Sequence, residues 1–427
     1  MCLMGLLYMG KRGNMAVVRP FYCIRPKAEV AHRVAALPYD VYSRAEAKTE
    51  AKKDSLSFIN IDRPETQFGD EQDMYADEVY KKAREMLDAK VADGTFIVEN
   101  ERCYYVYELV MDGRSQTGIV ACAFVDDYMD GVIKKHENTR EDKELDRIRH
   151  VEACDAQTGP IFLAYRGRTE LAELVRQVKQ EKKLYGFTAQ DGVVHNVWRI
   201  ADSERIKKIS AGFAAVESIY IADGHHRAAS AVKVALKRRR EHPGYNGTEE
   251  FNYFLSVLFP EEELMILPYN RVVKDLNGMT EEEFLAAVGE RFFVEECGRN
   301  AVTPENKGIF GMYLDGRWFR LKLKQGSAGS DNPVSALDVA VLQDSLLAPI
   351  LGIGDPRTDP RIQFVGGIRG LSELERRVGQ NMAVAFSMYP TSISELFAVS
   401  DAFMLMPPKS TWFEPKLRSG LFIHRLS

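Results

Sequence analysis

The sequence predicts an α+β fold in which mixed sheets pack against helices. Strand-like and helix-like segments follow one another irregularly, without the regular alternation that produces a doubly wound parallel sheet. Two stretches of alternating apolar and polar residues each contain an Asp-Gly pair typical of a hairpin turn, at Asp112-Gly113 and at Asp315-Gly316. With 427 residues, the chain is long enough for two or three domains.

The first elements are a strand over residues 16–24 and two helices. Ser43 is a good N-cap for a helix over 44–53, and the helical spacing over 73–92 ends near Gly94. Further elements are expected in this order: a strand over 160–167, an amphipathic helix over 169–183, an apolar strand over 251–260 and a capped helix over 280–291.

Residues 1–14 contain a short apolar stretch followed by basic residues, which is the reverse of the order in a secretory signal. We interpret them as a start assigned too early or a non-native segment, and we expect the fold to begin at Met15. No apolar run approaches the ~20 residues that span a bilayer.

The composition, with 45% hydrophobic and 28% charged residues, is typical of a soluble globular protein. The net charge of −5 argues against a nucleic-acid partner, which usually requires a basic surface. Six cysteines without CxxC spacing indicate reduced thiols in a cytoplasmic protein. The sequence does not indicate an oligomeric state.

The stretch IYIADGHHRAASAV at 219–232 places polar residues between a short apolar strand and a run of strong helix formers that begins at Ala228. A strand-to-helix junction offers free backbone N–H groups and the positive end of the helix dipole, which together favour phosphate. Gly224 allows close backbone approach, and the guanidinium of Arg227 can bind two phosphate oxygens. The pattern therefore predicts a phosphate-binding turn.

Three neighbours of Gly224 could add chemistry to this turn. Asp223 could hold a metal ion or accept a proton, and His225 and His226 could donate to phosphate or act as acid and base. An ordinary turn with a helix cap is the structural alternative. A metal site is a third interpretation, although adjacent histidines usually point apart and rarely bind one ion.

A second polar cluster, KKHENTREDKELDRIR, follows a short strand pattern at residues 134–149. Glu137 beside His136 at a strand end is a plausible general base, and Thr139 could cap the helix that follows. A solvated helix start with ion pairs four residues apart is the alternative. Arg147 could reach an anion from this helix.

A third cluster lies in MPPKSTWFEPK near the C-terminus. Lys409, Ser410 and Thr411 offer a cation and two hydroxyls that could close over a nucleotide or a substrate carboxylate, and the alternative is a rigid strand with its aromatic residues in the core. Asp40, in the Pro-Tyr-Asp stretch before Ser43, is a candidate contact for a substrate amine.

The chain resembles a bacterial and archaeal family catalogued as domain of unknown function 1015. The resemblance runs from about Arg19 to the C-terminus and is carried by LPYDVYSRAEA, KKHENTREDKELDR, YIADGHHRAAS, PYNRVV and MPPKSTWFEPKLRSGL. The stretch YIADGHHRAASA is also similar to the Gly-x-x-Arg phosphate-binding turn of the ParB/sulfiredoxin superfamily. Its Asp-Gly-His-His-Arg form looks like that of the free serine kinases of the SerK type.

This resemblance implies a ParB/sulfiredoxin-like core around the strand, turn and helix. The expected regions are an N-terminal α+β region over 15–195, the core over 196–275 and a C-terminal α+β region with the Lys-Ser-Thr loop over 276–427. By this resemblance the nucleotide phosphates would be held by Gly224, His225, His226 and Arg227. The side chains of the third cluster, Lys409, Ser410 and Thr411, are predicted as further phosphate contacts.

The resemblance also implies roles for the remaining site residues. Asp223 would lie near Mg²⁺ or the transferred phosphoryl group. Glu137 is the best candidate for the glutamate that deprotonates the acceptor hydroxyl, with His136, Thr139 and Asp40 as candidate substrate contacts.

The implied activity is transfer of a phosphoryl group from ATP or ADP to a small hydroxylated metabolite, with free L-serine as the leading acceptor. No GxxxxGK[ST] pattern is present, which excludes a P-loop kinase. The alternatives are a ParB-like nucleotide-binding regulator without metabolite chemistry, and a phosphatase that acts on a phosphorylated small molecule.

Overall fold

The computed structural model describes residues 15–324 and 332–427, so the predicted extraneous start at residues 1–14 lies outside it. The chain forms two compact units. The first contains the described residues up to Leu264 together with Pro415–Ser427, and the second is Met265–Glu414. The C-terminal segment therefore returns to the first unit.

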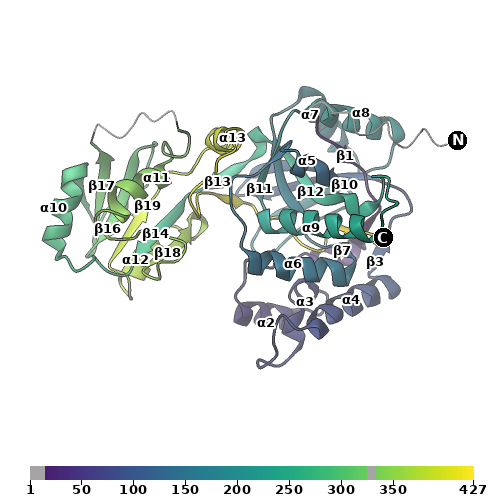
Figure 1. The fold of residues 1–427 in the computed structure, drawn as a ribbon, viewed down its shortest axis with the longest axis horizontal. Helices are drawn as coiled ribbons and strands as arrows, with labels where there is room; N and C mark the ends of the chain where they lie inside the picture. The colour runs from purple at the N-terminus through teal and green to yellow at the C-terminus, as the bar shows by residue number, and fades with distance from the viewer. Residues whose placement is uncertain (1–14, 325–331) are drawn as a thin grey trace. The chain divides into compact units, whose positions relative to one another are not determined.

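The main sheet of the first unit is mixed (Figure 1). Its strands, in spatial order, are β6 (Ile133–Lys134), β11 (Ile219–Asp223), β8 (Ile161–Tyr165), β12 (Tyr253–Pro260), β5 (Arg114–Phe124), β4 (Tyr104–Met111), β10 (Val194–Ile200) and β9 (Tyr185–Thr188). β6 runs parallel to β11 and β8 parallel to β12, whereas the remaining pairs along this path are antiparallel. β1 (Val18–Arg19) pairs with β5 off this path. The mixed sheet confirms the predicted α+β class.

A second sheet of the same unit joins segments that are far apart in the sequence. Its strands, in order, are β3 (Phe96–Val98), β2 (Cys23–Pro26), β21 (Ile423–Arg425) and β7 (Ala156–Gln157). The C-terminal strand β21 thus pairs with an N-terminal strand, β2.

The helices of the first unit are α1 (Ala31–Val34), α2 (Arg44–Lys53), α3 (Ile59–Asp62), α4 (Asp77–Ala92), α5 (Val125–Met129), α6 (Glu141–Cys154), α7 (Thr169–Val178), α8 (Ser203–Ala214) and α9 (His225–Glu241). α6 packs against α9, and α9 also contacts β8 and β12 of the main sheet (Figure 1). Apolar residues of β11 and α9 such as Ile221, Ala228 and Ala231 belong to the core cluster that fills this interface. The strand and the helix on either side of the polar turn are therefore fixed by burial.

The local signals in the sequence form as predicted. Asp112 and Gly113 have φ of 51° and 78° and join β4 to β5, which is the geometry that a two-residue hairpin turn requires. Ser43 caps α2 by accepting from the Glu46 N–H, and the Glu46 carboxylate accepts from the Ser43 N–H in return.

The second unit is also α+β. The strands of its main sheet, in order, are β15 (Phe292–Gly298), β17 (Arg317–Leu323), β16 (Ile309–Leu314), β19 (Val384–Ser387), β14 (Tyr269–Val273) and β18 (Ile362–Gly366), and β13 (Met265–Leu267) pairs separately with β20 (Trp412–Glu414). Its helices are α10 (Glu281–Arg291), α11 (Asp338–Leu342), α12 (Ser372–Val378) and α13 (Ile393–Asp401). Trp318 on β17 is fully buried in its core. The hairpin of β16 and β17 turns at Asp315-Gly316, as the sequence predicts.

Within residues 15–324 and 332–427, no helix combines the length and the apolar character needed to cross a membrane.

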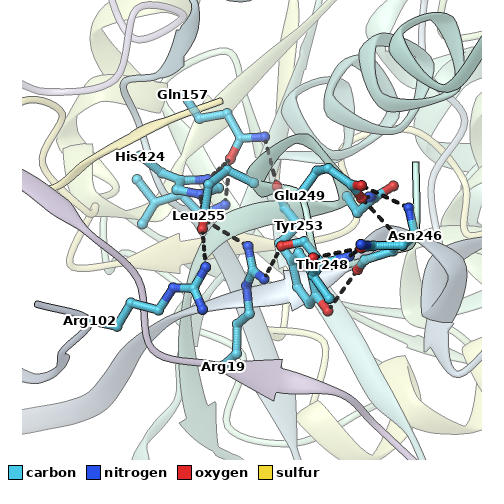
Figure 2. Close-up of polar contacts among 12 residues, drawn as sticks. Arg19, Arg102, Gln157, Asn246, Thr248, Glu249, Tyr253, Leu255 and His424 are labelled. Carbon is cyan, nitrogen blue, oxygen red and sulfur yellow. Dashed lines mark hydrogen bonds and ion pairs between the residues drawn. The ribbon is translucent and has the colours of Figure 1, made fainter. Parts of the chain in front are cut away.

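A network of ion pairs links segments near the two ends of the first unit's sequence (Figure 2). Glu250 accepts from Arg19 on β1 and from Arg102 just before β4, each at 2.7 Å, and it lies 2.8 Å from Nε2 of His424 on β21. Burial raises the pKa of Glu250, but His424, Arg19 and Arg102 outweigh it and lower the pKa to about 2. The carboxylate therefore stays ionised and holds three separate segments.

The buried His195 on β10 makes the stability of the first unit depend on pH. Burial, followed by the nearby Arg418, lowers the pKa of His195 to about 3, and Asp191 acts in the opposite direction. In the unfolded chain the imidazole takes up a proton near pH 6.5. His195 therefore stabilises the fold fully above pH 6.5, and its contribution falls by about 1.4 kcal/mol for each pH unit below that value, down to about pH 3.

We predict that urea unfolding of the wild type shows a lower free energy of unfolding at pH 5 than at pH 7, and that His195→Gln makes this difference about 2 kcal/mol smaller. His32→Gln, at an exposed histidine of α1, is the matched control and should keep the wild-type difference. An unchanged pH dependence in His195→Gln would contradict the assignment of a neutral buried imidazole.

Candidate functional site

The two polar clusters of the N-terminal unit meet because β6 and β11 are parallel neighbours. Ile219 pairs with Ile133, and Tyr220 pairs with Lys134. The carboxyl ends of parallel strands lie at the same edge of a sheet. The loop after β6, residues 135–140, and the turn after β11 therefore come together although they are about 85 residues apart in the sequence.

Gly224 is the N-cap of α9, with φ of +93°. The register of β11 against β8 shifts between Ile221 and Asp223, and Asp223, the last paired residue, faces Phe162 just before the helix. The helix begins at His225, three residues before the run of helix formers at Ala228, so His225, His226 and Arg227 form its first turn. No side chain caps this helix start, which leaves the N-terminal dipole facing the site.

The loop of residues 135–140 is held against α9 by its own contacts. The Arg140 N–H donates to Nε2 of His226 at 3.0 Å. The Thr139 hydroxyl donates to Glu144 of α6, whose carboxylate also binds Lys233 of α9. The predicted capping role of Thr139 is wrong, because α6 begins at Glu141 with Arg140 as its N-cap and without a side-chain cap.

His136, Glu137 and His225 form a compact cluster at this edge. Their ligand atoms all lie within 4.8 Å of one another, and Nδ1 of His225 is 3.6 Å from a Glu137 carboxylate oxygen. The His136 and His225 rings meet edge to face at a centroid distance of 4.5 Å. Both histidines are buried, whereas the Glu137 side chain is 41% exposed.

Burial keeps both histidines of the cluster neutral. It lowers the pKa of His136 to about 4, and Asp223 opposes this shift only in part. Burial, followed by the neighbouring His136, lowers the pKa of His225 well below its ordinary range. At neutral pH these imidazoles can accept or donate a hydrogen bond, but they carry no charge.

Positive charge at the turn comes from Arg227 and Lys416. Nζ of Lys416, just after the return of the chain to the first unit, lies 3.1 Å from the Asp223 carboxylate, whose other oxygen accepts from the Gly224 N–H at 2.9 Å. Burial raises the pKa of Asp223, but Lys416 and then Arg227 outweigh it and hold the pKa well below its usual range. The helix start thus carries an ionised carboxylate and two cations.

Arg227 lies tightly against its own turn. A Cβ at position 224 would be 3.1 Å from the guanidinium, so any other residue there would push the guanidinium aside by a few tenths of an ångström. Its Nη1 donates to the Pro160 carbonyl at the start of β8, while its Nε is buried and has no partner among the described residues.

A pocket with about 470 Å³ of empty space, open solvent at its mouth included, is lined in part by Arg227. Besides Arg227, its polar lining includes Arg147 of α6, Asp62 at the end of α3, Thr158 and Tyr39. The Arg147 guanidinium stacks 3.9 Å from the Tyr39 ring centre and pairs with Asp146, and the Thr158 hydroxyl donates to Asp62 at 2.8 Å. The pocket offers cations, one carboxylate and an aromatic wall.

The other predicted site residues are distant in sequence from the turn at residues 224–227. Asp40 is exposed beside Tyr39. Lys409, Ser410 and Thr411 belong to the second unit, where Arg271 donates to the Lys409 carbonyl and the Ser410 hydroxyl donates to the Pro407 carbonyl at 2.6 Å. Their role in phosphate binding stays a prediction.

Sequence reasoning missed Lys416 and two polar residues of the pocket lining, Asp62 and Thr158. Lys416 ends the MPPKSTWFEPK stretch, but Lys409 has the more conspicuous neighbours. Asp62 and Thr158 stand in segments without any motif, and only the fold brings them to Arg227. Tyr39 stands beside the candidate Asp40 in the sequence, but a tyrosine just before a helix cap is commonly structural.

The chain matches known proteins at the level of a family. The family model described as "Protein of unknown function (DUF1015)" matches residues 18–340. No curated protein matches the chain.

The chain is similar to several solved structures, with low TM-scores and low sequence identities. A free serine kinase mutant in complex with AMP is 14% identical, with a TM-score of 0.35 and coverage of 70% of this chain and 92% of that chain. A C-terminally truncated SbnI from Staphylococcus aureus is 11% identical, with a TM-score of 0.37 and coverage of 70% and 85%. A conserved hypothetical protein from Pyrococcus furiosus is 14% identical, with a TM-score of 0.33 and coverage of 71% and 94%.

We predict that the Gly224→Ala and Gly113→Ala variants lose similar stability through backbone strain. Only the Gly224→Ala variant should bind anions more weakly. Both glycines have positive φ, so each substitution should lower the free energy of unfolding by about 1 kcal/mol. Only at Gly224 does the new methyl group displace a guanidinium, because nothing lies within 4 Å of a Cβ at Gly113. Titration with inorganic pyrophosphate should show weaker binding for Gly224→Ala alone. Equal pyrophosphate affinities in the two variants would contradict a phosphate-binding turn.

Proposed function

This chain belongs to the DUF1015 family, and we propose that it transfers a phosphoryl group from ATP or ADP to the hydroxyl of a small metabolite, with free L-serine as the leading acceptor. The observation that carries the proposal is the convergence of Glu137 with the first turn of α9 at one sheet edge. A carboxylate there lies beside a helix start that attracts phosphate. Phosphoryl transfer requires this combination of a proton acceptor and fixed positive charge.

The turn would hold the phosphates of the donor. The backbone N–H groups at the start of α9 and the dipole of a 17-residue helix favour a phosphate group. The buried Nε of Arg227 gains a partner when an anion binds, and Lys416 adds a second cation near the same place. His225 is proposed as a neutral N–H donor or acid–base group and His226 as an N–H donor or acid–base group, and Lys409, Ser410 and Thr411 are proposed as further phosphate contacts.

Mg²⁺ is expected with the nucleotide, but the surroundings of Asp223 do not fit an ion held by the protein. Its two oxygens already accept from Lys416 and from the Gly224 N–H, and Arg227 is also close. A cation bound at this carboxylate would face an ammonium group 3.1 Å away from the carboxylate oxygen. Mg²⁺ prefers several oxygen ligands, and the phosphates of a nucleotide can supply them. The role of Asp223 in our proposal is to orient Lys416 and the turn.

Glu137 is the proposed general base. Its partly exposed carboxylate can meet an acceptor hydroxyl, and the buried neutral rings of His136 and His225 restrict its position. General-base catalysis of this kind typically contributes 10²–10⁴-fold.

The pocket beside Arg227 supports a zwitterionic amino acid as the acceptor. Asp62 supplies a buried carboxylate for an ammonium group, while Arg147 and Arg227 supply cations for a carboxylate. Asp40, Thr139 and His136 are proposed as additional substrate contacts. The five described cysteines are free, which supports activity in the reducing cytoplasm.

We predict that the purified protein, incubated with Mg²⁺, L-serine and either ATP or ADP, forms phosphoserine detectable by mass spectrometry. Glu137→Gln should lower turnover by 10²–10⁴-fold and leave the nucleotide Kd unchanged, because the base is lost but the phosphate contacts remain. Glu141→Gln, at an exposed glutamate in the first turn of α6, is the matched control and should keep wild-type turnover.

Three outcomes would overturn parts of this proposal. Wild-type turnover in Glu137→Gln would remove Glu137 as the base. Tight nucleotide binding without phosphoserine would favour the nucleotide-binding regulator. Release of phosphate from phosphoserine in the absence of any nucleotide would favour the phosphatase.

A further inference from the structure

Two buried histidine nitrogens of the cluster at the β6 and β11 edge have no hydrogen-bond partner among the residues that the structure describes. They are Nδ1 of His136 and Nε2 of His225, on side chains that are 2% and 5% exposed. A buried polar atom without a partner costs about 1–3 kcal/mol, so such atoms in a native fold commonly mark a bound ion or another function. Glu137 completes the cluster, and the ligand atoms of the three residues lie within 4.8 Å of one another.

The surroundings of His136 resemble those of a histidine that binds a metal ion. Its ring hydrogen-bonds the backbone carbonyl of Ile221, which leaves Nδ1 as the unpartnered nitrogen. Metal-binding histidines usually donate their second nitrogen to a carbonyl or a carboxylate, because this bond fixes the orientation of the ring. Ile221 belongs to β11, so the strand that positions the turn also orients this imidazole.

The donor set selects the class of ion. Two imidazole nitrogens and one carboxylate suit Zn²⁺, Co²⁺ and other late first-row divalent ions, whereas Mg²⁺ and Ca²⁺ prefer oxygen ligands. The two imidazoles come from separate elements, His136 from the loop after β6 and His225 from α9. Their separation in the sequence removes the difficulty that adjacent histidines, such as His225 and His226, point apart.

We propose that His136, Glu137 and His225 bind one late first-row divalent cation such as Zn²⁺ through two imidazoles and one carboxylate. Three protein ligands leave a coordination position open to water or to an oxygen of a bound ligand. The site does not depend on the proposed phosphoryl transfer. An ion held there occupies the carboxylate that we propose as the general base, so the metal-bound protein and the form active in phosphoryl transfer are distinct states.

The test is a titration of the full chain, freed of metal by dialysis against a chelator, with Co²⁺ and with Zn²⁺ in the absence of nucleotide. Co²⁺ should give visible absorption bands typical of a low-coordinate nitrogen and oxygen site, and Zn²⁺ should abolish them at one equivalent per chain.

Glu137→Gln is the decisive variant, because its side chain is partly exposed and the fold should tolerate the change. It should weaken Co²⁺ binding at least tenfold, and His136→Asn should do the same, whereas His32→Asn at an exposed histidine should bind as the wild type does. Circular dichroism checks that each variant is folded. Absence of one-equivalent binding in the wild type, or Co²⁺ spectra and affinities that are the same in Glu137→Gln and His32→Asn, would overturn the proposal. Neither result would bear on phosphoserine formation, which is measured separately with Mg²⁺.

Discussion

The candidate site depends on the parallel pairing of β6 with β11. These two strands share only two pairs of residues, Ile219 with Ile133 and Tyr220 with Lys134, yet the pairing sets which loops meet. The chain leaves both strands at the same edge of the sheet. After β6 it enters the loop that carries Glu137, and after β11 it enters the first turn of α9. An antiparallel β6 would have sent that loop to the opposite edge, and neither cluster would have a partner.

Burial and charge distinguish the residues at this edge into neutral and charged groups. His136 and His225 are too deeply buried to carry charge, so they are neutral rings beside Glu137. The positive charge comes instead from Arg227 and Lys416, which balance the ionised Asp223. The result is a helix start with excess positive charge next to one carboxylate that solvent can reach. The positive charge suits an anionic phosphate donor, and the carboxylate suits an acceptor whose hydroxyl must lose a proton.

Much of this arrangement was predictable from local patterns. The Asp-Gly hairpins, the capped helices and the polar turn after an apolar strand depend on neighbouring residues, so the sequence displays them directly. The start of α9 at His225 was less predictable, because histidine has only moderate helix propensity and the first turn is fixed by Gly224 and by packing against the sheet.

The contacts of Thr139, Lys416 and Asp62 could not be read from the sequence. Thr139 precedes an acidic helix and looks like a cap, but Glu144 competes for its hydroxyl once α6 packs on α9. Lys416 reaches Asp223 only because the C-terminal segment returns to the first unit, and Asp62 meets Arg227 only through the arrangement of α3 and α9 around the pocket. Such long-range contacts follow from topology, which no single stretch of sequence reveals.

A crystal structure of the chain with bound ADP tests the central claim most directly. The account predicts phosphate oxygens within hydrogen-bond distance of backbone N–H groups at the start of α9 and of the Arg227 guanidinium, with Glu137 on the open side of the terminal phosphate. A nucleotide bound elsewhere on the chain, with the first turn of α9 and Nε of Arg227 unchanged, would contradict it.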